Sequence, residues 1–387
     1  MIVLSELQNK AIKSIYEWYS KNEKPYYVLG GIAGSGKSTV VKFVIEELGI
    51  NKFKLATYTG KAATVLLTKG NKEACTIHRL IYNTKIMKDP KTGKKKYITT
   101  LKEKEELSEL ELIIIDEYSF LNNKIIEDLL SFDVPILFCG DPCQLPPITG
   151  ENKLKMDFFL DEPHRQALED PIFLIANYAR LGEFGKIKIG KYGDNVEIYS
   201  SMEFPMDKLE NSDQIIACKN KTVDSLNTFY RYQFLEYKDN LIHENEKVVC
   251  CMNDWDKVNE EEFALVNGMV GIASEIKIKE KAQVYHLNFK PDFTTKFTNV
   301  YVDKLLFEGK TLENANIITK LARNPIEELN KLNEFKYAYA MTCHKLQGSE
   351  ANNIIFFPEA LNRDRELYKK LFYTGVTRAK EKLVIAL

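Results

Sequence analysis

Two kinds of hydrophobic run alternate along the first part of the chain. Residues 4–18 carry apolar side chains at helical spacing, and Ser5 and Gln8 have the spacing of a capping box at a helix N-terminus. Short continuous apolar runs, typical of buried strands, recur at Tyr26–Leu29, Phe53–Ala56, Leu112–Ile115 and Ile136–Phe138. Helical stretches separate these runs, and this order predicts an α/β fold with a mostly parallel sheet covered on both faces.

Residues 82–107 interrupt this order. Within them, residues 85–104 contain eight lysines against two acidic residues, and residues 89–93 at the centre are turn-forming. The pattern predicts a basic β-hairpin that projects from the first domain, with a solvated surface loop as the alternative. Tyr82 and Tyr97, at the ends of this hairpin, would either stack on a base or pack inward.

A second α/β region follows at residues 164–247 and resumes at residues 336–387. Between these parts, residues 248–335 are rich in strand-forming sequence. The strand-like runs are Lys247–Met252, Met269–Ile278, Gln283–Phe289 and Val300–Leu306. We predict a small β-barrel inserted into the second domain.

The chain has 387 residues, 44% of them apolar, which is enough for two or three domains. It has no run of about 18 apolar residues, so no membrane span is expected, and its first residues lack the features of a secretory signal. Seven cysteines without paired Cys-x-x-Cys spacing argue against a disulfide scaffold and a structural zinc site, and favour a reducing, cytoplasmic location. The net charge of −1 neither argues for nucleic-acid binding nor excludes it.

The segment Gly31–Thr39 matches the phosphate-loop pattern G-x-x-x-x-G-K-[ST] between a predicted strand and a predicted helix. Its glycines let backbone N–H groups curl around phosphates, and the helix N-terminus adds a positive dipole. Lys37 would reach the β- and γ-phosphates of ATP, and the Ser38 hydroxyl would hold Mg²⁺. The candidate nucleotide-binding residues of this loop are Gly34, Ser35, Gly36, Lys37, Ser38 and Thr39.

Two further motifs follow predicted strands. Asp116 and Glu117 come directly after Leu112–Ile115, at the carboxyl edge where ligands bind to open α/β sheets. Asp116 suits Mg²⁺ coordination, and Glu117 suits the positioning and activation of an attacking water. Gln144, in the segment after Ile136–Phe138, stands where a neutral amide can contact the γ-phosphate.

With these three motifs the chain resembles superfamily 1 helicases, most closely the RecD-like and Dda-like branch, superfamily 1B, whose members move 5′ to 3′. Asn253–Trp255 and Val266–Gly271 resemble the SH3-like insert of the RecD branch. The resemblance implies two RecA-like parallel-sheet domains, with a β-hairpin insertion in the first and an SH3-like β-barrel insertion in the second. The implied boundaries are residues 1–81 and 108–163 for domain 1A, 82–107 for hairpin 1B, 164–247 and 336–387 for domain 2A, and 248–335 for insert 2B.

The resemblance also implies which residues contact each ligand. Thr57–Ala63 resembles a DNA-contacting motif, although Tyr58 stands where the family usually has proline. The implied nucleic-acid contacts are Thr59, Gly60, Lys61, His78, Thr342 and His344. The implied further nucleotide contacts are Gln8, Gly348, Glu350, Arg165 and Arg378. Gln8 would read adenine, with its capping-box role as the alternative, and the two arginines would stabilise charge on the transferred phosphoryl group.

An ATP-dependent 5′–3′ DNA helicase and single-strand translocase is the function that this resemblance implies. ATP hydrolysis between the two domains would move the protein along single-stranded DNA towards a duplex junction. A monomer is expected, with ATP and Mg²⁺ as ligands, single-strand-binding or replication proteins as candidate partners, and a role in replication or recombination. Three alternatives stay open: an RNA helicase or remodeller of the same superfamily, a P-loop kinase of small molecules, and a non-enzymatic DNA-binding protein with a relic nucleotide site.

Overall fold

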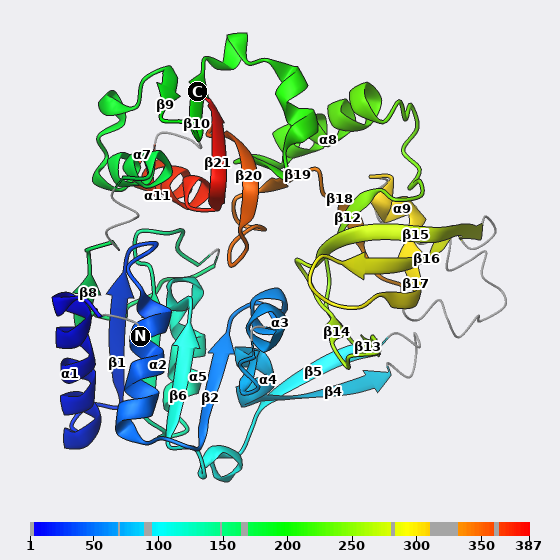
Figure 1. Ribbon diagram of the computed structural model, residues 1–387. Helices are drawn as coiled ribbons and strands as arrows, with labels where there is room; N and C mark the ends of the chain where they lie inside the picture. The colour runs from blue at the N-terminus through cyan, green and yellow to red at the C-terminus, as the bar shows by residue number, and fades with distance from the viewer. Residues whose placement is uncertain are drawn as a thin grey trace.

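The computed structural model describes residues 4–68, 70–88, 95–147, 149–163, 169–279, 283–309, 332–359 and 364–387. Within these ranges the chain forms two six-stranded sheets, one five-stranded sheet and two two-stranded pairs. Figure 1 shows the first sheet in the lower unit, the second sheet and the C-terminus in the upper unit, and the five-stranded sheet at their side. None of the described helices is long and apolar enough to span a membrane.

The first sheet is parallel throughout, with strand order β3-β2-β6-β7-β1-β8. Its strands are β1 (Tyr26–Gly31), β2 (Phe53–Thr57), β3 (Ala74–Thr76), β6 (Leu112–Asp116), β7 (Ile136–Gly140) and β8 (Phe158–Leu160). The helical segments of this unit are α1 (Glu6–Lys21), α2 (Lys37–Leu48), α3 (Gly60–Thr68), α4 (Ile77–Ile81), η1 (Lys104–Leu107), η2 (Tyr118–Phe120) and α5 (Asn123–Leu130). The helix predicted at residues 4–18 thus begins after its Ser5 cap and continues to Lys21.

Both faces of the first sheet are buried, which explains why its strands are continuous apolar runs in the sequence. On one face, Tyr27 and Leu29 of β1 belong to the same core as Ala11 and Ile15 of α1. On the other face, Val28 packs in a core that includes α4 and α5. Successive residues of one strand therefore serve two hydrophobic cores, and the predicted sheet covered on both faces is confirmed.

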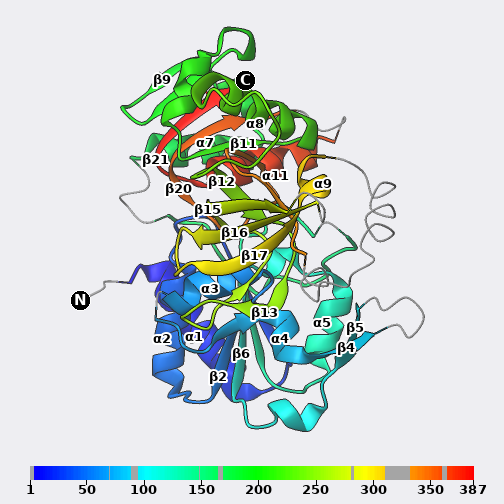
Figure 2. The same cartoon turned by 90° about the vertical axis from the view of Figure 1, so that its right-hand side faces the viewer.

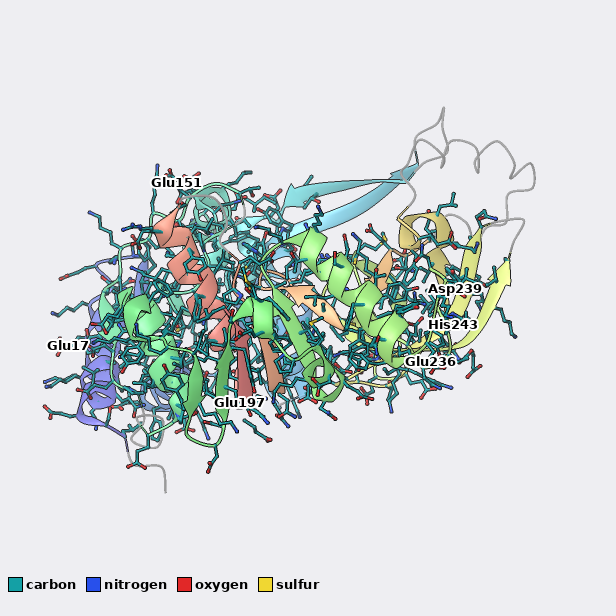
Figure 3. All side chains as sticks on the ribbon, turned by 90° about the horizontal axis from the view of Figure 1, so that it is seen from above. Glu17, Glu151, Glu197, Glu236, Asp239 and His243 are labelled. Atoms are coloured by element: carbon teal, nitrogen blue, oxygen red, sulfur yellow. The ribbon has the colours of Figure 1, made fainter. Side chains whose placement is uncertain are left out.

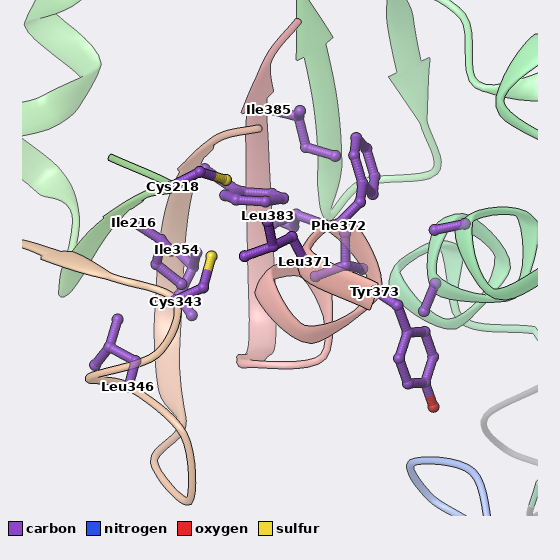
Figure 4. Packing of buried hydrophobic residues seen from close by; sticks show 14 of the residues in the cluster. Ile216, Cys218, Cys343, Leu346, Ile354, Leu371, Phe372, Tyr373, Leu383 and Ile385 are labelled. Carbon is purple, nitrogen blue, oxygen red and sulfur yellow. The ribbon is translucent and has the colours of Figure 1, made fainter. Parts of the chain in front are cut away.

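The second sheet has strand order β19-β11-β20-β21-β10-β9 and is parallel except for β9 at its edge. Its strands are β9 (Gly190–Tyr192), β10 (Val196–Tyr199), β11 (Gln214–Ala217), β19 (Ala340–Thr342), β20 (Ala351–Phe357) and β21 (Ala379–Ala386). Its helical segments are α7 (Pro171–Leu181), η3 (Phe184–Lys186), η4 (Ser201–Glu203), η5 (Met206–Asn211), α8 (Asn220–Phe234) and α11 (Arg365–Val376). Figure 4 shows Leu371 and Phe372 of α11 in the core that they share with Ile354, Leu383 and Ile385 of the sheet. The predicted α/β class with parallel sheets is confirmed.

The five-stranded sheet is antiparallel, with order β17-β16-β15-β12-β18. Its strands are β12 (Lys247–Cys250), β15 (Val270–Lys279), β16 (Val284–Pro291), β17 (Phe297–Asp303) and β18 (Phe335–Tyr337), and the pair β13 (Asp254–Val258) and β14 (Ala264–Leu265) lies in the same segment. The strand predicted at Val300–Leu306 is wrong in its last three residues. The Asp303 carboxylate accepts a hydrogen bond from the Leu305 N–H at 2.9 Å, and Lys304–Phe307 forms the helical turn α9.

Within residues 82–107, β4 (Tyr82–Lys88) and β5 (Lys95–Leu101) form an antiparallel pair. The turn predicted at residues 89–93 and the Tyr97 side chain lie outside the described part of the chain. Figures 1 and 2 show the pair extending from the first unit on the side where the antiparallel sheet lies. The Tyr82 hydroxyl donates a hydrogen bond to Asp128 of α5, so Tyr82 packs inward at the base of the pair.

A buried ion pair joins the antiparallel sheet to the second unit. The Arg231 guanidinium on α8 donates to Glu246 at 2.7 Å and lies 4.1 Å from the centre of the Tyr337 ring of β18. Asp239 and His243, labelled close together in Figure 3, hydrogen-bond to each other at 2.8 Å, and Asp239 lies 3.7 Å from Arg231. Separating such a pair would leave a buried charge without its partner, so this junction resists separation.

Candidate nucleotide cleft and nucleic-acid groove

The phosphate loop joins β1 to α2 and contains two glycines in left-handed backbone conformations. Gly34 has a φ of 75° and Gly36 a φ of 80°, values that favour glycine over residues with a side chain. Lys37 is the first residue of α2, and its ammonium donates to the carbonyl oxygens of Gly31 and Ile32 at 2.9 and 3.0 Å. The loop therefore holds its own lysine at the positive end of a helix of 12 residues.

Ser35 is packed into the base of this loop. A Cβ atom at Gly31 would lie 2.6 Å from the Ser35 hydroxyl oxygen, so a side chain at that position would displace it. That hydroxyl is buried and has no hydrogen-bond partner among the described residues, which fits a phosphate oxygen as its partner.

Gln8 connects α1 to the phosphate loop. Its side-chain N–H donates to the Ser35 carbonyl oxygen at 3.0 Å, and its side-chain oxygen accepts from the Ser5 N–H at 2.9 Å. The predicted capping box between Ser5 and Gln8 is confirmed. The reading of adenine by Gln8 stays a prediction.

The two carboxylates lie at the carboxyl end of β6, which is separated from β1 by β7. Asp116 is the last residue of β6, and its carboxylate accepts from the Glu117 N–H at 3.0 Å. Glu117 has a left-handed backbone, with a φ of 60°. Burial and then the nearby charge of Asp116 raise the pKa of Glu117 to about 7. A carboxylate with such a pKa is well matched to proton transfer at neutral pH.

Arg378, between α11 and β21, brings the second unit to this edge of the first sheet. Its side chain is 5% exposed, and its guanidinium donates to the Gln144 side-chain oxygen at 3.2 Å. It also donates to the carbonyl oxygens of Thr374 at 3.0 Å and Ser349 at 3.3 Å, which fix its orientation. Gln144 itself donates to the Asp141 carboxylate at 3.4 Å. The structure thus brings together two predicted site residues that are 234 positions apart.

Tyr373 on α11 makes a second contact between the two units. Its hydroxyl accepts a hydrogen bond from the Ala33 N–H of the phosphate loop at 3.0 Å and donates one to Asp141 at 2.7 Å. Burial, reinforced by Asp141, raises the pKa of Tyr373 well above its ordinary value, so the hydroxyl keeps its proton. Figure 4 shows this ring pointing away from the other labelled residues. The next residue, Thr374, accepts from the Leu145 N–H at 3.1 Å.

A groove of about 650 Å³ is lined by the first unit, the second unit and the segment that carries β13 and β14. The predicted nucleic-acid contacts that line it are Thr59, Gly60, Lys61, His78 and His344. Residues at its wall that sequence reasoning did not assign include Tyr58, Asn122, Trp255, Lys345 and Gln347. Thr342 does not line the groove: it is 8% exposed, and its hydroxyl accepts from the Lys345 N–H at 3.3 Å.

The groove has one lysine whose pKa is shifted strongly. Burial lowers the pKa of Lys61 to about 8, while Asp292 raises it and Lys247 lowers it further. Lys61 is therefore mostly protonated at pH 7. Desolvation also lowers the pKa of His344 and of His78, which is still exposed in the groove, so both rings offer hydrogen bonds rather than charge at neutral pH.

Helix α3 is also the place where the first unit contacts the other two. A Cβ atom at Gly60 would lie 2.6 Å from the Val266 side chain, which follows β14. A Cβ atom at Gly348 would lie 3.4 Å from the Cβ of Ala62. These two glycines, predicted as ligand contacts, therefore also allow the units to approach each other closely.

Two family models match the chain. Residues 8–150 match a AAA domain, and residues 337–386 match the UvrD-like helicase C-terminal domain. The first range contains the phosphate loop and both carboxylates, and the second contains His344 and Arg378.

Three known proteins are similar to nearly the whole chain. The ATP-dependent DNA helicase Dda of Enterobacteria phage T4 is 27% identical and covers 93% of this chain and 94% of its own length. An uncharacterized protein of Methanocaldococcus jannaschii, MJ1519, is 27% identical over 92% of this chain, which spans only 36% of that protein. The crystal structure of the Pif1 helicase from Bacteroides in complex with ADP-AlF3 and ssDNA is similar with a TM-score of 0.55 and 20% sequence identity. The match covers 100% of this chain and 92% of the Pif1 chain.

RecD and Pif1 helicases are among the further homologues. The two matched domains and these homologues fit a superfamily 1B helicase. Two further predicted nucleotide contacts are Arg165 and Glu350. Arg165 lies outside the described residues. Glu350 is exposed and forms an ion pair with Lys380 at 3.4 Å.

The sequence did not identify Tyr373, which joins two units, or Tyr58 and Trp255, which line the groove. Tyr373 lies in the same matched segment as Arg378. The sequence of that segment does not distinguish a core tyrosine from one whose hydroxyl joins two units. Tyr58 carried one signal, because it replaces the usual proline of its motif. Trp255 also lies in a recognised motif, and only the position of β13 brings it to the groove.

The oxygen donors of the helicase cleft fit a nucleotide with a divalent cation. The phage T4 homologue is an ATP-dependent helicase, which fits a nucleotide as the ligand of this cleft. Ser38 and Asp116 are hard oxygen ligands of the kind that Mg²⁺ prefers. Within the described ranges, no group of three or more His, Cys, Asp or Glu side chains could hold a metal ion. Mg²⁺ suits this donor set, because it usually keeps several waters and phosphate oxygens as ligands.

Proposed function

We propose that this protein is an ATP-dependent DNA helicase that moves 5′ to 3′ along single-stranded DNA and separates the duplex ahead of it. The observation that carries the proposal is the contact of Arg378 and Tyr373 with the phosphate-loop edge of the first sheet. The groove lies between the same two units, so a nucleotide that changes their separation also changes the groove. The similarity to phage T4 Dda, over nearly the full length of both chains, supports the same activity.

ATP would bind between the two units. Lys37 and the N-terminus of α2 hold its phosphates, and Ser38 and Asp116 hold Mg²⁺, which would neutralise charge on the phosphates. Glu117 accepts the proton of the water whose oxygen attacks the γ-phosphorus, while the bond from that phosphorus to ADP breaks. Arg378, oriented by Gln144, stabilises the charge that develops during this transfer.

The division into domains is part of this proposal. The first unit is domain 1A (1–81 and 108–163), the second is domain 2A (164–247 and 336–387), and residues 248–335 are an SH3-like insert 2B. The pairing of β12 with β18 supports it, because the chain leaves and re-enters the second unit through neighbouring strands. Hairpin 1B (82–107) is the proposed wedge at the duplex junction.

Binding to the strand is expected to tolerate any sequence and to weaken with salt, because backbone phosphates are its main electrostatic partners. The protein would act as a monomer at junctions between duplex and single strand. Single-strand-binding or replication proteins are the candidate partners.

The deciding experiment is unwinding of a partial duplex that carries either a 5′ or a 3′ single-stranded tail, with ATP and Mg²⁺. We expect the native protein to open only the 5′-tailed substrate, and we expect the Lys37→Ala variant to open neither substrate. Opening of the 3′-tailed substrate alone would overturn the direction. If DNA stimulates ATP turnover but neither duplex opens, the protein is a translocase and the hairpin is not a wedge.

The same assay separates the alternative functions. ATPase stimulation by single-stranded RNA but not DNA would indicate an RNA helicase. Turnover with no polynucleotide present would favour a small-molecule kinase, for which the match of residues 337–386 to a helicase model has no explanation.

A further inference from the structure

The groove has aromatic side chains that the polar contacts of the proposed mechanism do not use. Tyr58, between β2 and α3, is 38% exposed, and Trp255 of β13 is 41% exposed. Both line the groove, one from the first unit and the other from the insert. Two exposed rings in the lining of one groove suit a ligand with aromatic faces.

Tyr58 is supported from behind by other rings. Its ring lies edge-on to His78 with centroids 6.1 Å apart, and His78 lies 5.5 Å from Tyr82. Tyr82 is fixed by its hydrogen bond to Asp128. The series of rings limits the freedom of Tyr58, and it leads from the groove to the base of the β4–β5 pair.

Trp255 is the less constrained ring. Within the described part of the chain its indole has neither a hydrogen bond nor a ring contact. Figures 1 and 2 show β13 and β14 extending from the antiparallel sheet towards the first unit, and the contact of Val266 with Gly60 fixes that approach. The exposed indole at the groove wall offers an aromatic face on which a ligand ring can stack.

Gln347 is a third side chain at the groove, and it has an unsatisfied donor within the described ranges. Gln347 lines it, and its side-chain NH₂ group is buried without an acceptor among the described residues. Such a group needs an acceptor, and nucleobases offer carbonyl oxygens and ring nitrogens.

We propose that Tyr58 and Trp255 form a base-stacking subsite, in which unpaired nucleobases of the bound strand stack on one ring from the first unit and one from the insert. This inference rests on the proposed function and extends it from the phosphates to the bases. The insert then takes part in holding the strand. Stacking tolerates every base, because every base has an aromatic face.

The subsite makes part of the affinity independent of salt. Phosphate contacts weaken as salt displaces them, but stacking does not release counterions. Loss of one stacking ring typically weakens binding by about fivefold or more. An oligonucleotide without bases should therefore bind more weakly than oligothymidylate of the same length, and the ratio of the two dissociation constants should persist at high salt.

The test uses two labelled oligonucleotides of about twelve positions, one of thymidines and one of abasic residues, a length usual for such grooves. With the native protein we expect the abasic strand to bind at least about fivefold more weakly in fluorescence anisotropy. In the double variant Tyr58→Ala/Trp255→Ala this ratio should fall several-fold, with the Gln347 contact as the base contact that is left. Tyr58→Phe and Trp255→Phe keep a ring and should keep the ratio, and Tyr16→Ala, at a tyrosine of α1 that is 45% exposed, is the matched control.

Fluorescence reports stacking directly, because the chain has two tryptophans, Trp18 and Trp255. In Trp18→Phe, Trp255 is the remaining tryptophan, and saturating thymidine strand should quench its emission while saturating abasic strand should not. Equal binding of the two strands to the native protein, or an unchanged Trp255 emission at saturation, would overturn the subsite and leave the helicase proposal standing. If neither strand binds, both proposals fail.

Discussion

The two six-stranded sheets differ in what satisfies the N-terminus of a helix that follows a strand. In the first unit, β1 leads through a glycine-rich loop into α2, whose first turn has no acidic residue and no side-chain cap. In the second unit, β11 leads directly into α8, and the chain supplies its own anion. Glu359, just after β20, accepts from the N–H groups of Cys218 at 3.3 Å and Lys219 at 3.2 Å, and it also accepts from the Thr222 hydroxyl.

The difference shows where this architecture can take a nucleotide. Both helix N-termini offer unpaired N–H groups and a positive dipole. In the second unit a carboxylate satisfies them, so no phosphate is needed there. In the first unit the glycines leave room for a phosphate, and the second unit contributes instead the arginine and tyrosine that contact that site. The local residues, and not the parallel sheet, therefore decide which of the two helix N-termini is open to a phosphate.

The largest expected effect concerns Arg378, which belongs to the second unit and contacts Gln144 of the first. Arg378→Ala should lower the DNA-stimulated ATPase rate by ~10³ or more, because charge on the transferred phosphoryl group loses its stabilisation. Arg378→Lys keeps the charge but not the planar contacts, and it should recover only part of the rate. Steady-state turnover at saturating ATP measures this. A rate within threefold of the native one would mean that the first unit works alone.

The next effect concerns Tyr373, which joins the two units without carrying charge. Tyr373→Phe removes the bonds to Ala33 and Asp141, each worth about 0.5–1.5 kcal/mol, so the closed arrangement should weaken by about 1–3 kcal/mol. We expect a higher KM for ATP and a smaller effect of an ATP analogue on DNA affinity. Tyr368→Phe is the matched control on the same helix, because the Tyr368 hydroxyl has no hydrogen bond within the described ranges. Equal DNA affinities with and without nucleotide in the native protein would remove the basis of this prediction.

A smaller effect should fall on stability alone. Glu359→Ala leaves the N-terminus of α8 without its acceptor, and it should lower the free energy of unfolding by about 1–2 kcal/mol. The KM for ATP should stay native, since the proposed nucleotide site is at α2 and not at α8. Urea unfolding and ATPase assays of the same variant give both quantities. A marked loss of ATP affinity in a still-folded Glu359→Ala protein would contradict the separation of the two helix N-termini.

The smallest effect concerns DNA binding by the first unit. Because the pKa of Lys61 is lowered to about 8, this side chain loses its proton as the pH rises from 7 to 9. The charged form is the one that DNA phosphates favour, so single-strand affinity should fall over this range by about fivefold, about 1 kcal/mol for one charge pair in water. Lys61→Arg keeps its charge and should show a flat profile in anisotropy titrations. The same fall in both proteins would assign it to other groups.

The sequence predicted more of the nucleotide edge than of the groove. The phosphate loop, Asp116 and Glu117 follow continuous apolar strands, and their roles depend on neighbours within a few residues. Arg378 and Gln144 were also predicted, but their mutual contact was not. The DNA contact of Thr342 stays a prediction. The structure places Thr342 at the buried end of β19, because its strand pairs within the second sheet.

By itself, the sequence determined the elements whose signals are local. Apolar runs specify buried strands, a Ser5–Gln8 spacing specifies a cap, and glycines at Gly34 and Gly36 permit the left-handed turns of a phosphate loop. Only the tertiary structure decided which distant groups meet. Tyr373 reaches Ala33 across 340 positions, and Glu359 reaches Cys218 across 141. Such contacts depend on how distant segments of the chain pack together. The hydrophobic pattern within one segment does not predict that packing.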